Sequence, residues 1–456
     1  MRVSDRLLGR VVAGVLGGDA VVHLYWAAGG VWPAADAREL SQAVLNADVP
    51  FTPPVLLPLA VVLVAAAAAV RATAERRGGR RVRALCGLVT LAVAVGTAVR
   101  GVVGVVWAFG VGVEGEETFR LLDLVLYTPL CLLLAVAAGR LAGLGRRGRG
   151  AWLRHGALGA ALLLTGGLLY GAYGYAPGEQ RGYRPAGAQG AFVETPLARF
   201  HYEVSGSGSP VVLLSPGAAW TFAWRPQAEA LARTHTVYTV DLPGQGFTEL
   251  HGAGFTWDLD GMTGAVGEFL DAMHLPRVAM GGNSWSGGWA LAYAQRHPER
   301  VSRLALLASS GLDERDTWSW EALKIPVLGE ALVNLASGRS MAAATVRPLF
   351  AHPELATDAV VEAMWAPNTL DDNRRAAYLL ERGLDWRETQ AAMPRTGQPV
   401  LVLWGARDTT LPPAQAARFG RLLPAAEVHV LDGCGHALTL DCPAEVSGLM
   451  EGFLHD

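Results

Sequence analysis

The stretch that decides the fold is residues 278–288, Val-Ala-Met-Gly-Gly-Asn-Ser-Trp-Ser-Gly-Gly, continued by Trp-Ala-Leu-Ala-Tyr-Ala at residues 289–294. An apolar run of strand type enters a glycine-rich corner that holds Ser284, and a helical pattern follows. Glycines suit this corner because the backbone segments approach too closely for side chains. A strand, a tight turn and a helix in this order raise the serine hydroxyl above a sheet and aim the helix N-terminus at it. Ser284 is therefore a candidate nucleophile.

The corner departs at one position from the usual Gly-x-Ser-x-Gly pattern, since its fifth residue is Ser286. Serine is the next smallest polar residue and two glycines follow at once, so we interpret Ser286 as a tolerated variant. Taken alone, the stretch could also be a glycine and serine loop without chemical meaning. Residues elsewhere in the chain decide between these interpretations.

Two polar residues follow two later apolar runs. Asp408 comes shortly after residues 399–404, and His436 comes shortly after residues 427–431. Short β-type runs alternate with helical patterns in this half of the chain, which predicts a largely parallel sheet with its site at the carboxyl ends of the strands. A reactive serine needs an imidazole to take its proton and a carboxylate to hold the imidazole tautomer. The candidate strands are residues 200–204, 210–215, 236–240, 277–281, 303–308, 399–404 and 427–431.

Residues from about 191 to 456 resemble the α/β-hydrolase superfamily with a helical cap over about residues 311–394, in which helical patterns cover residues 321–335, 341–350, 358–364 and 372–384. The resemblance rests on Gly-Asn-Ser-Trp-Ser-Gly-Gly at 282–288, Asp-Leu-Pro-Gly-Gln-Gly-Phe at 241–247, Leu-Trp-Gly-Ala-Arg-Asp at 403–408 and Gly-Cys-Gly-His at 433–436. The superfamily uses its serine, acid and histidine in the order Ser284, Asp408, His436. These motifs are specific for the superfamily and not for a substrate.

Asp313 is the alternative to Asp408 as the acid, because some hydrolases place theirs after the strand that corresponds to residues 303–308. The pattern Gly-x-x-Asp after the penultimate strand favours Asp408.

The oxyanion segment departs from the family pattern. Members commonly carry His-Gly after the strand that corresponds to residues 210–215, whereas this chain has Ser-Pro-Gly-Ala-Ala-Trp at 215–220. The donors in such a hole are backbone N–H groups, so the histidine side chain is dispensable. By position we assign the N–H groups of Ala218 and Trp285. The alternative is that Pro216 distorts the turn and removes the hole.

The first 175 residues have a different composition, rich in Val, Leu, Ala and Gly with clusters of Arg. Five apolar runs in it approach the roughly 20 residues that cross a bilayer as a helix. They are about residues 8–28, 51–70, 84–109, 121–138 and 152–173. We therefore expect a helical transmembrane module at 1–175 with about five spans, a Gly- and Pro-rich linker at 176–190, and the α/β domain at 191–456.

Charge in the loops predicts the orientation. Arginines gather before the first run, between the second and third, and between the fourth and fifth, while the opposite loops carry acidic residues. The positive-inside rule makes the basic side cytoplasmic. We therefore expect a multi-pass protein of the cell membrane, with lipid bilayer around the module and the α/β domain on the extracytoplasmic side.

Ionisable residues also occur inside the runs. Isolated charges at such depth are costly and usually pair with one another. We predict that Arg100 pairs with Asp123, with Asp19 or with both, and the alternative is that Arg100 extends to the membrane interface.

Other composition features narrow the function. The net charge is −3 and no basic stripe lies outside the membrane-flanking loops, so we expect no nucleic-acid partner. No clustered ligand set predicts a metal, and no cofactor is expected. Cys434 and Cys442 are either a disulfide, if their domain lies outside the cell, or two buried thiols.

The leading interpretation is a membrane-anchored serine hydrolase that cleaves an ester, thioester or amide bond of a small or lipophilic substrate through an acyl-enzyme. Apolar cap residues favour an apolar substrate: Trp318, Trp320, Leu335 and Trp365. The helix after Ser284 also resembles that of proline iminopeptidases, although their His-Gly-Gly-Pro-Gly segment is missing. A non-catalytic sensor or scaffold is the third alternative. Dehalogenases and epoxide hydrolases are disfavoured because their nucleophile is an aspartate.

Overall fold

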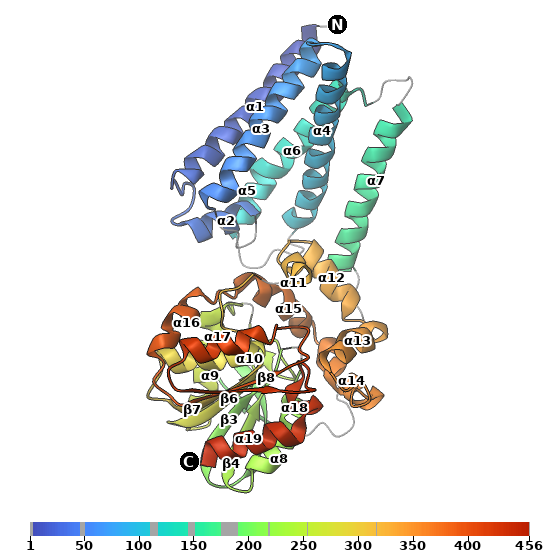
Figure 1. The fold of residues 1–456 in the computed structure, drawn as a ribbon. Helices are drawn as coiled ribbons and strands as arrows, with labels where there is room; N and C mark the ends of the chain where they lie inside the picture. Colours follow the sequence, from blue (N-terminus) through green and yellow to red (C-terminus); the bar gives the residue numbers. More distant parts are fainter. Residues whose placement is uncertain are drawn as a thin grey trace. The chain divides into compact units, whose positions relative to one another are not determined.

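The structure is a computed structural model that describes residues 3–45, 51–109, 117–144, 151–174, 190–217, 219–252, 254–315 and 317–455. The chain divides into two compact units, Met1–Gly174 and Tyr175–Asp456 (Figure 1). Of the expected linker, only Gly190 belongs to the described residues.

The regular secondary structure of unit 1 is helical in the residues described. Five of its segments are long and apolar enough to cross a membrane, as the sequence predicts: Asp5–Ala27, Pro53–Glu75, Arg80–Ala108, Phe119–Ala142 and Leu153–Gly174. The elements are α1 (Val3–Ala27), α2 (Ala37–Leu45), α3 (Pro53–Glu75), α4 (Arg80–Ala108), α5 (Glu117–Leu122), η1 (Asp123–Tyr127), α6 (Thr128–Ala142), α7 (Ala151–Leu169) and η2 (Tyr170–Gly174). The short helix α2 was not expected, and its Leu40 packs with Trp26 and Leu56.

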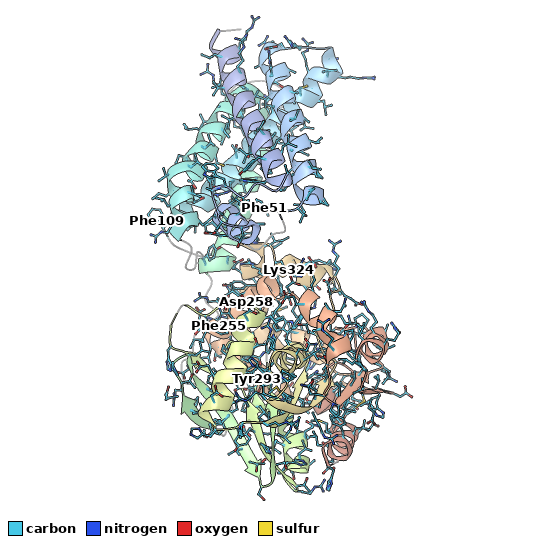
Figure 2. The ribbon with its side chains drawn as sticks, turned by 90° about the vertical axis from the view of Figure 1, so that its left-hand side faces the viewer. Phe51, Phe109, Phe255, Asp258, Tyr293 and Lys324 are labelled. Atoms are coloured by element: carbon cyan, nitrogen blue, oxygen red, sulfur yellow. A yellow bond between two sulfur atoms is a disulfide. The ribbon has the colours of Figure 1, made fainter. Side chains whose placement is uncertain are left out.

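The chain direction alternates between neighbouring helices of unit 1. Gly9 near the start of α1 packs against Ala74 at the end of α3. A Cβ added at position 9 would lie only 2.2 Å from the Cβ of Ala74. Arg140 in the last turn of α6 pairs with Asp5 of α1 at 3.3 Å. Phe51 and Phe109 both lie at the opposite end of the unit (Figure 2). This up-and-down order brings the arginine clusters flanking α1, α3 and α4 to one end of the unit.

A charged pair lies inside unit 1. Arg100 Nη2 of α4 is 2.6 Å from Asp123 Oδ1 at the start of η1, and the Asp123 side chain is fully buried. Thr128 donates a hydrogen bond to the other oxygen of Asp123 at 3.0 Å. The pairing prediction is thus confirmed for Asp123. Among the described residues, Asp19 contacts His23 (3.3 Å) and no ion pair joins it to Arg100.

Breaking this pair should destabilise unit 1. Arg100→Asp or Asp123→Arg alone brings two like charges together in a buried place, a cost of about 3–5 kcal/mol. The double variant restores opposite charges, so its thermal unfolding midpoint in detergent should recover most of either single loss. Additive losses in the double variant would contradict a stabilising contact.

Unit 2 contains a nine-stranded sheet in the order β1-β2-β4-β3-β6-β7-β8-β9, with β5 paired to β2. β1 and β2 run antiparallel, and the strands from β4 to β9 along the path run parallel. The strands are β1 (Ala191–Glu194), β2 (Ala198–Gly206), β3 (Ser209–Leu214), β4 (His235–Val240), β5 (Glu249–Leu250), β6 (Val278–Asn283), β7 (Val301–Leu307), β8 (Val400–Gly405) and β9 (Ala426–Leu431). All seven expected strands are confirmed, and β1 and β5 are additions.

Helices cover both faces of this sheet. α8 (Arg225–Leu231) and α19 (Pro443–His455) lie together on one face, while α9 (Leu259–Ala272), α10 (Trp285–Arg296) and α17 (Ala414–Leu422) lie on the other (Figure 1). Central strands buried on both faces read as continuous apolar runs, as Val211–Leu214 and Val400–Trp404 do. The main core of the unit is built on these runs.

A helical cap is inserted between β7 and β8, as expected. It consists of α11 (Trp318–Leu323), α12 (Leu328–Ala336), α13 (Arg339–Val346), η4 (Arg347–Leu349), α14 (Asp358–Trp365), η5 (Ala366–Thr369), α15 (Asp371–Gly383), α16 (Arg387–Ala392) and η6 (Met393–Arg395). The single helix expected at 321–335 is two helices. Pro326 separates them because proline lacks the N–H that would continue the first.

Candidate active site

Ser284 stands at the corner between β6 and α10, and its backbone is strained. Its φ and ψ are 62° and −126°, a combination that costs a non-glycine residue about 1–3 kcal/mol. Neighbouring groups hold the turn in place. Ser284 N donates to the Leu307 carbonyl at 2.9 Å, and Ser284 O accepts from Ser310 N at 3.0 Å. The side chain is left half-buried at the carboxyl edge of the sheet.

The residues around Ser284 explain the glycine pattern. A Cβ on Gly282 would lie 2.3 Å from the backbone of Ser286, so only glycine fits there. Ser286 itself is buried, and its hydroxyl lies 3.0 Å from the carbonyl oxygens of Leu214 and Asn283. It also accepts a bond from Asn283 N. Ser286, which replaces the second glycine of the pattern, thus links the end of β3 to the corner by a hydrogen bond.

Asp408 and His436 are brought together. His436 Nδ1 lies 2.8 Å from Asp408 Oδ2, and both side chains are buried. The other oxygen of Asp408 accepts from Thr410 N at 2.8 Å and from Leu411 N at 2.9 Å. The carboxylate is therefore fixed by its own loop and presents one oxygen to the imidazole. Within the described residues no hydrogen bond joins His436 to Ser284, which lies at the same sheet edge.

The alternative acid, Asp313, lies elsewhere. Its side chain is exposed, and its backbone N–H donates to Gln390 Oε1 at 3.1 Å. Among the described contacts, the carboxylate that meets His436 is that of Asp408.

Of the two residues assigned to the oxyanion hole, the structure describes Trp285 and not Ala218. Trp285 is the first residue of α10, where backbone N–H groups point out of the helix end. Ala218 lies outside the described residues. Gly217 beside it packs on the Trp285 ring, since a Cβ there would come within 2.9 Å of Cε3. The segment after β3 therefore runs next to Trp285. A hydrogen bond from Ala219 N to Pro216 O, 3.2 Å long, closes the turn at Pro216.

A second carboxylate, that of Asp241, accepts hydrogen bonds from both ends of this segment. No role was expected for Asp241 from the sequence. It is fully buried and accepts from Ser215 Oγ (2.6 Å), Thr221 N (2.9 Å) and Phe247 N (3.0 Å). His201 Nδ1 is 2.7 Å from its Oδ2. The signal was Asp-Leu-Pro-Gly-Gln-Gly, whose acid directly follows β4.

A third carboxylate, Asp441, links the cap to the histidine loop and was also missed. It is buried and accepts from Gly435 N (2.6 Å), Ala351 N (2.9 Å) and His352 N (3.0 Å). No local pattern marks it, because two of its three partners are backbone groups about ninety residues away in sequence. It fixes the residue before His436 against the cap.

Cys434 and Cys442 form a disulfide with Cα atoms 6.0 Å apart, which decides the alternative that the sequence left open. The loop it closes contains His436 and Asp441. With Glu445 these sulfurs are the one group of metal-type ligand atoms found in the described residues, within 4.8 Å of one another. As a disulfide they offer no thiolate, so the group does not fit a metal.

The four cap side chains expected to favour an apolar substrate lie in different places. Trp365 is buried inside the cap, and its indole N–H donates to Ser337 O at 2.8 Å, so its role is packing. Trp320 reaches the corner, where its ring lies 6.0 Å from that of Trp285. Trp318 and Leu335 are exposed.

Comparison with known families agrees with this geometry. A family described as "alpha/beta hydrolase fold" matches residues 209–443, about half of the chain. A second family, described as "Protein of unknown function (DUF3995)", matches residues 16–138.

Curated relatives cover the C-terminal half. A dihydrolipoyllysine-residue acetyltransferase component of an acetoin cleaving system from Pseudomonas putida is 31% identical over 259 residues, covering 56% of this chain and 65% of that protein. A 2-hydroxy-6-oxo-2,4-heptadienoate hydrolase from Pseudomonas putida is 27% identical over 267 residues, covering 55% of this chain and 90% of the relative. The chain thus spans less than two thirds of the length of the first of these.

Solved structures share the fold. The meta-cleavage product hydrolase CumD from Pseudomonas fluorescens superimposes with a TM-score of 0.51 at 20% identity, covering 58% of this chain and 97% of that one. A membrane phospholipase A described as a bacterial virulence factor superimposes with a TM-score of 0.52 at 24% identity. The match covers 72% of this chain and 96% of that one. At these identities the likeness shows the fold alone.

Proposed function

The chain belongs to the α/β-hydrolase family, and from this premise we propose that unit 2 is a serine hydrolase acting on an ester, thioester or amide bond. Ser284 is the nucleophile, His436 the general base and Asp408 its orienting acid. The observation that carries the proposal is the buried His436–Asp408 pair at the same sheet edge as the strained corner of Ser284.

The chemistry follows from these positions. Asp408 accepts from His436 Nδ1–H and so leaves Nε2 free to take the Ser284 proton. Ser284 Oγ bonds to the substrate carbonyl carbon, and the carbonyl oxygen becomes an oxyanion that the N–H groups of Trp285 and Ala218 stabilise. The carbon–heteroatom bond then breaks, and His436 returns the proton to the leaving group. Water, deprotonated by His436, hydrolyses the acyl-enzyme and restores Ser284.

The substrate class is small or lipophilic. Trp320 and Trp285 place aromatic rings beside the nucleophile, which favours an apolar acyl group over a charged one. A proline-iminopeptidase-like aminopeptidase and a non-catalytic scaffold are the competing functions.

A labelling and substrate panel with purified full-length protein separates the three. A serine hydrolase reacts with a fluorophosphonate probe and turns over esters of increasing acyl length. An aminopeptidase would instead prefer aminoacyl amides, and a scaffold would show neither labelling nor turnover.

We also propose that the five apolar helices anchor the enzyme in the cell membrane with unit 2 on the extracytoplasmic side. The arginine clusters at one end of unit 1 support this orientation. The Cys434–Cys442 disulfide supports it independently, because disulfides persist in oxidising compartments outside the cytosol.

Trypsin added to intact cells tests the orientation. The segment that joins the units contains Arg181 followed by Gly182, a bond that trypsin cuts, so cleavage there should release unit 2 from whole cells. The arginine-rich stretch 76–83, which joins α3 to the first turn of α4, is the internal control, since it should be cut only after permeabilisation. Release of unit 2 only after permeabilisation would reverse the proposed orientation.

A further inference from the structure

Exposed apolar side chains of unit 2 are concentrated on the cap. Eight large hydrophobic residues of this unit are exposed among those described, and five of them lie within the stretch 318–341. These five are Trp318 (83% exposed), Ile325 (51%), Leu332 (37%), Leu335 (55%) and Met341 (44%). Single exposed apolar residues are ordinary on a protein surface, but such a concentration marks an interaction site. We call these five residues the cap face.

The helices that carry the cap face pack in series, and α12 and α13 bury part of their surface. α11 contacts α12, α12 contacts α13, and both α11 and α12 rest on α15 (Figure 1). In α12 the buried residues are Gly329, Glu330, Ala331 and Val333, while Leu332 and Leu335 are one helical turn apart on the outside. The cap face is therefore an outer surface of a packed layer.

The charges in this stretch are compensated. Lys324, which directly follows α11 (Figure 2), pairs with Glu321 at 3.4 Å, and Glu330 pairs with Arg382 at 2.7 Å. A surface with an exposed tryptophan, aliphatic side chains and a long cationic side chain at its edge has the composition that favours a membrane interface. Because these charges are already paired, the cap face does not need a strongly charged partner.

The covalent structure keeps this surface near a bilayer. The last candidate span ends at Gly174, and the first described residue of unit 2 is Gly190, sixteen residues later. A chain of that length reaches about 55 Å when fully extended. A unit of this size is about 45–50 Å across. Every face of unit 2 can therefore reach the membrane, and the short tether raises its local concentration there.

The cap face is also connected to the site. α11 carries the exposed Trp318 and the half-buried Trp320, and the Trp320 ring lies 6.0 Å from that of Trp285, the residue after Ser284. A single short helix thus spans the distance from the surface to the corner of the nucleophile.

We propose that the cap face docks on the surface of the bilayer in which the chain is anchored, and that the enzyme takes from it an ester whose acyl chain is dissolved in lipid. This proposal rests on the proposed function, both the hydrolase activity and the membrane anchor.

The kinetic test uses the full chain in phosphatidylcholine vesicles with two esters, a water-soluble short-chain p-nitrophenyl ester and a long-chain ester dissolved in the vesicles. Trp318→Ser with Leu335→Ser should lower turnover of the vesicle-bound ester on the order of tenfold, because two large apolar groups no longer enter lipid. Turnover of the soluble ester should stay within about twofold of the unchanged protein. Val204→Ser with Val430→Ser is the matched control, since both are exposed at 52% and 47% but lie on β2 and β9. Equal losses in the two pairs, or no loss in the cap pair, would overturn the proposal.

A positional test is independent of activity. In a background with the free cysteines Cys86 and Cys131 changed to alanine, a polarity-sensitive fluorophore is attached at Leu335→Cys or at Val430→Cys. Quenching by nitroxide-labelled lipids is expected at 335 and not at 430. An apolar environment at 335 without quenching would indicate contact with unit 1 or with a second copy, and would overturn bilayer docking. Quenching at 335 in a protein that turns over neither ester would sustain the docking and contradict the proposed function.

Discussion

Replacing Ser284 by alanine is expected to abolish labelling by a fluorophosphonate and to lower kcat/KM by a factor on the order of 10³ or more. The change removes the atom that would form the acyl-enzyme and leaves the backbone free to keep its turn. That turn is held by main-chain bonds to Leu307 and Ser310, which alanine retains. The folded fraction, measured by circular dichroism and thermal unfolding, should therefore be close to that of the unchanged protein.

Ser286→Ala is the matched control for this experiment. Its hydroxyl is fully buried between the carbonyl oxygens of Leu214 and Asn283, so removing it should cost about 1 kcal/mol of stability. Labelling should nevertheless persist, because the reactive hydroxyl is untouched. If the Ser284 variant is still labelled and the Ser286 variant is not, the nucleophile has been assigned to the wrong serine.

The sequence predicts the order of elements well because each one has a local signal. Runs such as Val211–Leu214 are apolar throughout, since they are buried on both faces of the sheet, and the spans of unit 1 are longer still. The additions are short or marginal: β5 has two residues, and α2 depends on packing with Trp26. The expected helix at 321–335 is interrupted at Pro326, because proline has no N–H to continue the helix even though the hydrophobic pattern runs across it.

The candidate site shows where prediction from sequence ends. Ser284, Asp408 and His436 follow strands in motifs, so they could be named from pattern alone. Asp441 could not be, because only folding brings its partners in the cap to it. The pair Cys434 and Cys442 was visible in the sequence, but the choice between a disulfide and two thiols depends on the compartment, which left it open. Asp441 receives its bonds from Gly435 and from the cap residues Ala351 and His352, about ninety residues away in sequence.

Asp408→Asn is expected to lower kcat by a factor on the order of 10³ to 10⁴. In the present geometry Oδ1 accepts from Thr410 N and Leu411 N, and an asparagine oxygen can keep both bonds. Its NH₂ group then takes the place of Oδ2 and donates to His436 Nδ1. That bond holds the imidazole with its proton on Nε2, so the ring can no longer accept the proton of Ser284. The loss should appear in kcat for soluble esters while the thermal midpoint changes little.

Asp313→Asn is the decisive partner of this experiment, because Asp313 is the other acid that the sequence offers. Its side chain is exposed, and its main chain contact to Gln390 Oε1 does not depend on the carboxylate. Activity in Asp313→Asn should therefore remain within about twofold of the unchanged enzyme. Full activity in Asp408→Asn together with a large loss in Asp313→Asn would transfer the orienting role to Asp313. It would also require the His436 loop to move away from the position in which Asp441 and the Cys434–Cys442 disulfide hold it.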